Sequence, residues 1–385
     1  MNEDKATRYN RLKRQVGVAS VAWGAFLLLA LVVSGGSVWL RDAAESLASL
    51  MAPEGWLRGL SVVVYVVLLT LLNEVGSVPL AFYGGFVLER HYGLSKQPIR
   101  IWAIDQVKSL ALGVVLGVFA ASILYAFIHR FPNAWWLPSA VVFAALIVGL
   151  ANLAPLLLLP LFYSVKPLTR ESLRTRLVAL GERAGARVLD AYEWGLGEKT
   201  SKANAALTGI GHSRRILVSD TMLEQYSDEE IEVVLAHELG HHVHGDIWKG
   251  LAFEAGLIFA GFLAASWMLR LTAPLAGLRD VSDIAGLPIL LLAAGAVSLV
   301  TVPAAHAMSR AHERRADRFA ISLTRNAPAF VSAMRRLAAQ NLAEDEPSTL
   351  VQWLFYSHPP IRERIEAARS FSRAEPASQS SEFRT

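Results

Sequence analysis

The stretch VLAHELGHHVHGD, residues 234–246, contains four histidines and two acidic residues within thirteen positions. On a helix, residues i and i+4 lie on the same face, so His237 and His241 present their imidazoles to one point. Glu238 lies beside them and can reach a water molecule held there. This H-E-x-x-H pattern is typical of zinc peptidases. The stretch therefore predicts a metal site on a helix.

A helix start precedes the motif. Ser227 followed by Glu230 is the pattern of a capping box, and Ile231, Val234 and Leu235 form the apolar side of the helix that follows. The alternative interpretation is a solvated polar helix face that carries histidines by chance. The start signal makes this alternative the weaker one, because the motif needs a helix and the sequence predicts one there.

Two further histidines compete as ligands. His242 points about 100° away from His241 around the helix and cannot join it. His244 shares the face, but it lies about 10.5 Å along the axis from His237. Bonds between zinc and nitrogen are only about 2.0–2.1 Å long. We therefore predict that His244 lies at the rim of the site and does not bind the metal.

The third ligand must come from another part of the chain, which contains no cysteine. The stretch AHERRADRFAISL, residues 311–323, carries Glu313 and Asp317 four residues apart on one helical face. We predict that Glu313 binds the metal and that Asp317 accepts a hydrogen bond from the outer nitrogen of a ligand histidine. Taken alone, these acids would pair with neighbouring arginines. Glu254, within an apolar stretch, is the fallback ligand.

Three protein ligands leave a fourth position for water, which is the pattern of a catalytic site. A zinc ion would lower the pKa of that water and polarise a peptide carbonyl. Glu238 would act as the general base and then pass the proton to the leaving amine. We expect one Zn²⁺ per chain.

The rest of the chain is strongly apolar. Hydrophobic residues make up 53% of it and charged residues only 18%, less than in an ordinary soluble domain. The lipid bilayer is therefore an expected partner. Six stretches are long and apolar enough to span it: they are Gln15–Leu40, Gly59–Leu88, Ser109–His129, Phe131–Val165, Gly250–Leu269 and Ile284–Ala307. The fourth stretch contains four prolines, so it is expected to kink, re-enter or split.

The loops between these stretches alternate between many and few Lys and Arg residues. By the positive-inside rule, this alternation places both termini and the polar segment 166–249 on the cytoplasmic side. The membrane would be the plasma or inner membrane in a bacterium and the endoplasmic reticulum in a eukaryote. The basic residues behind the formal net charge of +4 are distributed according to this topology and do not cluster into a nucleic-acid-binding patch. No nucleic acid is therefore expected as a partner.

Four motifs then resemble one family, the integral-membrane zinc metalloproteases related to CAAX prenyl protease 1. They are SKANAALTGI (201–210), HELGH (237–241), HERRAD (312–317) and SHPPIRERI (357–365). Residues 78–113 are similar to the N-terminal membrane domain of that family, and the resemblance covers about residues 55–370. The smaller HtpX-type proteases share the zinc motifs without this N-terminal domain.

The apolar stretches predict an all-α polytopic membrane protein with six transmembrane helices, and the family that the chain resembles is described with seven, so we expect six to seven. The resemblance implies a helical barrel around a chamber, joined to a zincin-type metallopeptidase domain with a small β element, for which 214–220 is a candidate strand. Such a chamber would account for Glu74 and Glu254 at membrane depth. We divide the chain into an N-terminal membrane domain with four spans (1–165), a metallopeptidase domain with two spans at 250–269 and 284–307 (166–371), and a disordered tail (372–385).

The resemblance also assigns roles to residues that carry no signal by themselves. Asn204 and Ala205 match an element that lines the cleft and pairs with extended substrate; alone they would belong to an ordinary loop. His358 and Arg364 match a pair expected to stabilise the developing oxyanion; alone, His358 would be a residue of a surface turn.

The sequence therefore predicts a zinc-dependent endopeptidase in a membrane, acting on a peptide or protein substrate. Two substrate classes stay open. One is removal of a C-terminal tripeptide from prenylated proteins, and the other is quality control of membrane proteins, as in HtpX-type enzymes. An inactive scaffold or transporter is a third alternative, and the intact set of His237, Glu238, His241 and Glu313 argues against it. The sequence makes no prediction of the oligomeric state.

Overall fold

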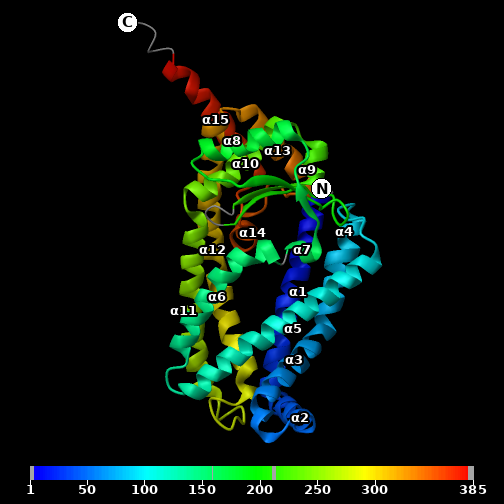
Figure 1. The fold of residues 1–385 in the computed structure, drawn as a ribbon, viewed down its shortest axis with the longest axis vertical. Coiled ribbons are helices and arrows are strands. Elements are labelled where there is room, and N and C mark those ends of the chain that lie inside the picture. The colour runs from blue at the N-terminus through cyan, green and yellow to red at the C-terminus, as the bar shows by residue number, and fades with distance from the viewer. Residues whose placement is uncertain (1–3, 158, 210–213, 380–385) are drawn as a thin grey trace.

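The structure is a computed structural model that describes residues 4–157, 159–209 and 214–379. The helices are α1 (Lys5–Val33), α2 (Gly36–Met51), α3 (Leu57–Ala81), α4 (Leu88–His91), α5 (Ile99–Arg130), α6 (Trp136–Leu157), α7 (Leu159–Phe162), α8 (Glu171–Arg183), α9 (Asp220–Gln225), α10 (Asp228–Val243), α11 (Asp246–Thr272), α12 (Leu287–Thr324), α13 (Ala327–Asn341), α14 (Thr349–Phe355) and α15 (Ile361–Gln379). The strands are β1 (Val165–Pro167), β2 (Asp190–Trp194), β3 (Ala205–Thr208) and β4 (Arg215–Ser219). Figure 1 shows the sheet at one end of the molecule and the long helices extending away from it.

Five helical segments of the described chain are long and apolar enough to cross a membrane. They are Lys5–Val33, Glu54–His91, Ile99–Arg130, Asp246–Thr272 and Ile284–Thr324. The apolar part of α6, Trp136–Ala151, is shorter. All six predicted stretches therefore overlap a membrane helix or this shorter apolar helix, and the mostly helical, polytopic fold is confirmed.

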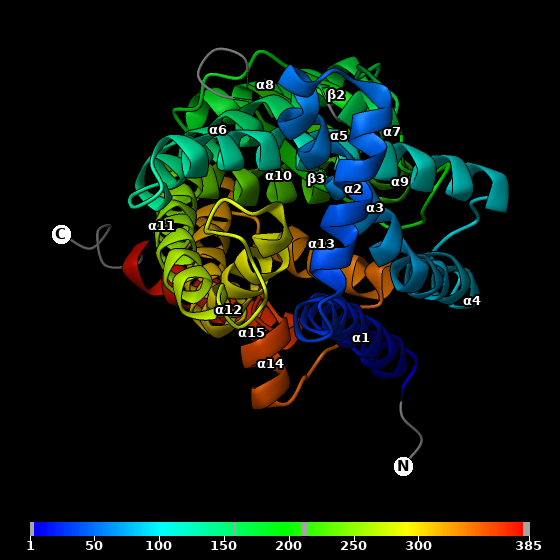
Figure 2. The same cartoon turned by 90° about the horizontal axis from the view of Figure 1, so that it is seen from below.

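The six helices close into a ring. In order around it, α1 packs against α3, α3 against α5, α5 against α6, α6 against α11, α11 against α12, and α12 returns to α1. Figure 2 shows this arrangement from below. The ring is the helical barrel that the resemblance implied, and it brings α1 from the start of the chain against α12 near its end.

The predicted first span does not continue to Leu40. α1 ends at Val33, and α2 begins only after Gly35, whose φ of +73° is a left-handed conformation that favours glycine. The predicted boundary was wrong because a hydropathy pattern ends a span at a charged residue, and the break between α1 and α2 contains none. The additional helix α2 packs against α3 at the end of the molecule far from the sheet (Figure 1).

The proline-rich stretch Phe131–Val165 forms α6 and the four-residue helix α7, and residue 158 lies outside the described chain. α7 leads directly to β1, so this stretch carries the chain from the membrane helices to the sheet. At the other end, α15 continues to Gln379, within the tail that we expected to be disordered, and 380–385 are not among the described residues.

The small sheet has the strand order β1-β2-β4-β3, with β2 and β4 parallel and the other pairs antiparallel. The predicted strand at 214–220 is β4, whose residues Ile216, Leu217 and Val218 are buried. Strand β3 is at the edge of the sheet and packs beside α10. This leaves one side of β3 open next to the helix that carries the H-E-x-x-H motif.

Candidate metal centre

Helix α10 begins with the capping box that the sequence predicts. The Ser227 hydroxyl accepts a hydrogen bond from the Glu230 amide (3.3 Å), and the Glu230 carboxylate accepts one from the Ser227 amide (2.9 Å). The apolar side of the helix, including Ile231, Leu235 and Leu239, is buried in the core beneath the sheet. The opposite side presents the histidines.

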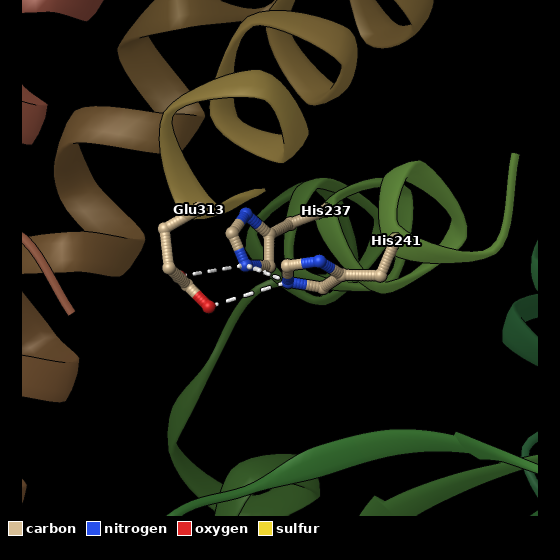
Figure 3. Close-up of side chains that lie close together, drawn as sticks. All are labelled: His237, His241 and Glu313. Atoms are coloured by element: carbon tan, nitrogen blue, oxygen red, sulfur yellow. Dashed lines mark hydrogen bonds and ion pairs between the residues drawn. The ribbon is translucent and has the colours of Figure 1, made fainter. Parts of the chain in front are cut away.

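Three side chains converge at one point between α10 and α12. The Nε2 atoms of His237 and His241 are 3.3 Å apart, and each lies 3.3 Å from a carboxylate oxygen of Glu313. Figure 3 shows the two imidazoles from α10 facing the carboxylate from α12. Among the described residues, these three form the group of His and acidic side chains close enough to share one metal ion.

A glycine lets the two helices approach this closely. A Cβ atom on Gly240 would lie 2.9 Å from the Cα atom of Ala316, a distance that requires the backbone to move. Gly240 follows His237 by one helical turn, and Ala316 follows Glu313 in the same way. The contact between these small residues therefore sets the distance between the ligand-bearing faces of the two helices.

A carboxylate orients His237 from behind. Asp317 Oδ1 lies 2.9 Å from His237 Nδ1. Because an ionised carboxylate only accepts hydrogen bonds, the proton is on Nδ1 and the Nε2 lone pair faces Glu313. Arg364 in turn donates to Asp317 from Nε (2.9 Å) and Nη2 (2.6 Å). Asp317 and Arg364 are both buried, so this paired charge network holds the ligand rigidly.

His241 has a corresponding carboxylate, which the sequence analysis missed. Asp246 Oδ2 lies 3.1 Å from His241 Nδ1, and Arg315 donates to Asp246 Oδ1 at 2.7 Å. Asp246 is the last residue of the stretch 234–246, but it is five positions after His241 and shares no helical face with it. The chain brings it back through Gly245, whose φ is +65°. A Gly-Asp pair directly after the motif is the signal that could have revealed it.

The residues present fit a metal ion. The Oε2 atom of Glu313 is buried and has no hydrogen-bond partner within the described chain. Burial alone would lower the pKa of His237, but the neighbouring carboxylates of Asp317 and Glu313 raise that pKa to about 9. Both observations mean that the site has negative charge in excess and attracts a cation. Two imidazoles and one carboxylate form a donor set of the kind that catalytic zinc sites use.

The cluster opens into a cleft of about 530 Å³. Glu238 lines this cleft beside the ligands, and burial raises the pKa of its carboxyl group. A raised pKa brings a carboxyl group nearer to the range in which it can both take up and release a proton. Asn10 of α1 lines the same cleft, so the first membrane helix contributes to its wall.

The four residues assigned by resemblance also line the cleft. Asn204 is exposed just before β3, and Ala205 is the first residue of that edge strand. His358 is at the mouth, with its side chain 61% exposed and its Nε2 atom 3.3 Å from Glu313 Oε1. Arg364 donates to Asp317 through Nε and Nη2, and it also lines the cleft.

The other candidates lie apart from the cluster. His244 caps the end of α10, with Nδ1 2.7 Å from the Gly240 carbonyl oxygen and its ring against Phe319. Glu254 lines a different cavity, between membrane helices, and is not among the grouped ligands. Glu74 lies on α3, on the opposite side of the ring from α11.

The fold and the site together define a metallopeptidase that is built on a ring of membrane helices. The chain belongs to Peptidase family M48, which matches residues 167–372. Residues 2–164 match a second family, described as the CAAX prenyl protease N-terminal domain with five membrane helices. In that range the described residues form the long helices α1, α2, α3, α5 and α6, of which α2 is not among the candidate membrane spans and α6 has only a shorter apolar part. The predicted class, an integral-membrane metalloprotease, is confirmed.

Individual relatives agree with this assignment. The uncharacterized metalloprotease YhfN of Bacillus subtilis is 31% identical over 94% of this chain and 84% of its own length. CAAX prenyl protease 1 of Saccharomyces cerevisiae is 28% identical over 78% of this chain and 70% of its own length. The crystal structure of S. mikatae Ste24p has the same fold, with a TM-score of 0.84 at 23% identity, covering 94% of this chain and 88% of that one.

Proposed function

We propose that this protein is a zinc-dependent endopeptidase that cuts peptide bonds at the cleft between α10, α12 and β3. The observation that carries the proposal is the spacing of the three donor groups. Tetrahedral bonds of about 2.0–2.1 Å place any two ligand atoms about 3.3–3.4 Å apart. The contacts among His237, His241 and Glu313 are 3.3 Å in every case. One zinc ion per chain fits this spacing.

Each residue of the site has a distinct task. His237, His241 and Glu313 hold the ion, and Asp317 fixes the tautomer of His237. When bound, the ion supplies Lewis acidity that polarises a peptide carbonyl and acidifies water. Glu238 takes up the proton from the attacking water and delivers it to the leaving amine.

The substrate binds as an extended strand beside β3. The open edge of β3 offers backbone groups for pairing with an extended peptide. Asn204 and Ala205 are at the start of that edge. We assign to His358 and Arg364, which line the cleft, the role of donating hydrogen bonds to the oxygen that gains negative charge during attack.

The substrate that we propose is the C-terminal segment of a prenylated protein, from which the enzyme releases a tripeptide. The relatives named CAAX prenyl protease 1 and the matching N-terminal domain support this class. We place the cleft and both termini on the cytoplasmic side. The alternation of basic residues between the loops supports this orientation.

The test pairs zinc analysis with peptide cleavage in the wild type and in Glu238→Gln. We expect about one zinc per chain in both proteins and cleavage only by the wild type, because Glu238 handles the proton without holding the ion. Equal activity of the variant would contradict the mechanism.

In the same assay, preference for a farnesylated peptide over its unmodified counterpart would support the proposed substrate. Equal cleavage of both would favour a quality-control protease of HtpX type.

A further inference from the structure

A seam of contacts joins the N-terminal membrane helices to the loop that leads into β3. We use "the seam" for Tyr9, Lys13, Glu89, residues 93–95 and Asp105 on the membrane side, and residues 199–202 on the peptidase side. No metal ligand belongs to it. Helix α4, which carries Glu89, lies at the same end of the molecule as the sheet (Figure 1).

The carboxylate of Glu89 is the centre of the seam. It accepts a hydrogen bond from the Tyr9 hydroxyl at 2.6 Å, and it lies 2.8 Å from Lys13 Nζ and 3.1 Å from Lys202 Nζ. The Glu89 side chain is only 11% exposed. A carboxylate buried to this extent requires charged and hydrogen-bonding partners. Its partners come from α1 on one side and from the approach to β3 on the other.

Backbone contacts extend this attachment along the loop. The Leu94 carbonyl oxygen accepts hydrogen bonds from the Ser201 amide and the Thr200 hydroxyl, both at 2.9 Å. The Ser95 hydroxyl donates to the Lys199 carbonyl oxygen, and Lys199 Nζ lies 2.5 Å from Asp105. The loop 199–202 is therefore fixed to the membrane domain residue by residue.

This loop ends where the substrate strand begins. Lys202 precedes Asn204 by two residues, and Ala205 opens β3. The backbone of Ala203 bonds to the Asn341 side chain through both its amide (3.2 Å) and its carbonyl (3.3 Å). Strand β3 pairs with β4 on one side only. The Asn204 amide donates to the Ser219 hydroxyl (3.0 Å), and the Asn204 carbonyl oxygen accepts from the Ser219 amide (2.9 Å). The position of the first residues of β3 therefore depends both on β4 and on what holds the loop in front of them.

We propose that Glu89 is a positioning residue for peptide binding: through Lys202, the membrane domain sets the position of Asn204 and the first residues of β3. This inference rests on the proposed function, in which that edge binds the substrate. Glu89 touches neither the metal ligands nor Glu238, so its effect should fall on substrate affinity. The membrane domain would then be part of the peptide-binding apparatus as well as an anchor.

The test is Glu89→Gln together with Lys202→Met in the full-length protein. We expect each variant to raise KM for a cleaved peptide about five- to tenfold, with kcat within about twofold of wild type and zinc content unchanged. The double variant should show about the same KM as either single variant, because both remove one interaction. Lys202→Met leaves Glu89 paired with Tyr9 and Lys13, so it tests the inference even where Glu89→Gln does not fold.

The matched control is Glu45→Gln. It removes a carboxylate that pairs with both terminal nitrogens of Arg279 (2.6 and 2.8 Å) at the opposite end of the membrane domain, and its KM should equal that of wild type.

The dissociation constant of the same peptide, measured in the Glu238→Gln background, gives a readout independent of turnover. Unchanged KM and dissociation constant in the seam variants would overturn the inference, as would a joint loss of zinc and kcat. A wild type that binds the peptide but does not cleave it would instead count against the proposed function.

Discussion

At the scale of single residues, the site is organised in pairs. Each ligand histidine has a buried carboxylate on its outer nitrogen: Asp317 for His237 and Asp246 for His241. Each carboxylate is itself held by an arginine, Arg364 or Arg315. These partners fix both tautomers so that both Nε2 atoms can bind a metal, which is the usual task of carboxylates around metal-binding histidines.

Asp246 should therefore matter for metal binding although it is not a ligand. We expect Asp246→Ala to weaken zinc affinity by about 10- to 100-fold, because the His241 ring loses the partner that orients it. Competition with a chelator of known affinity measures this change. Asp246→Asn, which retains one oxygen acceptor, should have a smaller effect. Wild-type affinity in Asp246→Ala would show that helix α10 alone is sufficient to place His241.

The choice of third ligand can be tested separately. Glu313→Ala should lose zinc, because it removes the donor from α12, whereas His244→Ala should keep it. His244 is bonded to the Gly240 carbonyl oxygen and is turned toward Phe319. Metal analysis of the two purified variants distinguishes the assignments. The reverse result, zinc kept without Glu313 and lost without His244, would identify a different ligand set.

The sequence anticipated the grouping of His237, His241 and Glu313, together with Asp317. Helical spacing places the two histidines on one helical face and the two acids on another. The H-E-x-x-H motif, which needs a third ligand from elsewhere, indicated that these faces meet. Asp246 could not be found in the same way. Its approach to His241 depends on a left-handed turn at Gly245, and a periodicity rule does not register a reversal of the chain.

At the scale of elements, the contact between α10 and α12 is the one that assembles the site. It depends on Gly240, because any Cβ there would collide with the backbone at Ala316. The long helix α12 also extends through two environments, the membrane and the peptidase domain. Its first part is apolar and crosses the membrane, and its later part carries Glu313 and Asp317 beside α10.

Gly240→Ala should separate the two helices. We expect it to destabilise the protein by about 1–3 kcal/mol, as overpacking of a tight core contact does, and also to lower zinc affinity because Glu313 moves away from the histidines. Thermal melting in detergent and chelator competition measure the two effects. Gly250→Ala is the matched control, since a Cβ at that helical position meets nothing within 4 Å. Equal behaviour of both variants would show that the helices are not in limiting contact.

Element boundaries were predicted less well than element positions. Hydropathy located every membrane helix, because lipid requires long uncharged stretches. It merged α1 with α2, because the break at Gly35 is a matter of backbone conformation and leaves the hydropathy unchanged. The proline-rich stretch Phe131–Val165, which we expected to kink, re-enter or split, contains α6 and α7 on either side of residue 158, which lies outside the described chain.

At the scale of the whole molecule, the ring has two ends of different character. The sheet and the metal centre are at one end, and α2 is at the other (Figure 1). The positive-inside rule predicts that the metal-centre end faces the cytoplasm. Since the chain has no cysteine, single introduced cysteines can report this orientation without background.

We expect Glu198→Cys, in the exposed loop after β2, to react with a membrane-impermeant maleimide only after the cells are opened. Glu54→Cys, between α2 and α3, should react in intact cells. Both positions are exposed, so a difference in labelling reflects the side of the membrane. Labelling of Glu198→Cys in intact cells would reverse the proposed orientation.

The order of the metal ligands along the chain has a consequence for the biosynthesis and folding of the enzyme. The two histidines are made before α11 and α12, and the glutamate is made after most of this hairpin. The site is therefore incomplete until both helices of the hairpin have been made and α12 has folded back against α10. A chain in which the hairpin has not formed lacks Glu313 beside the two histidines and has no assembled metal site.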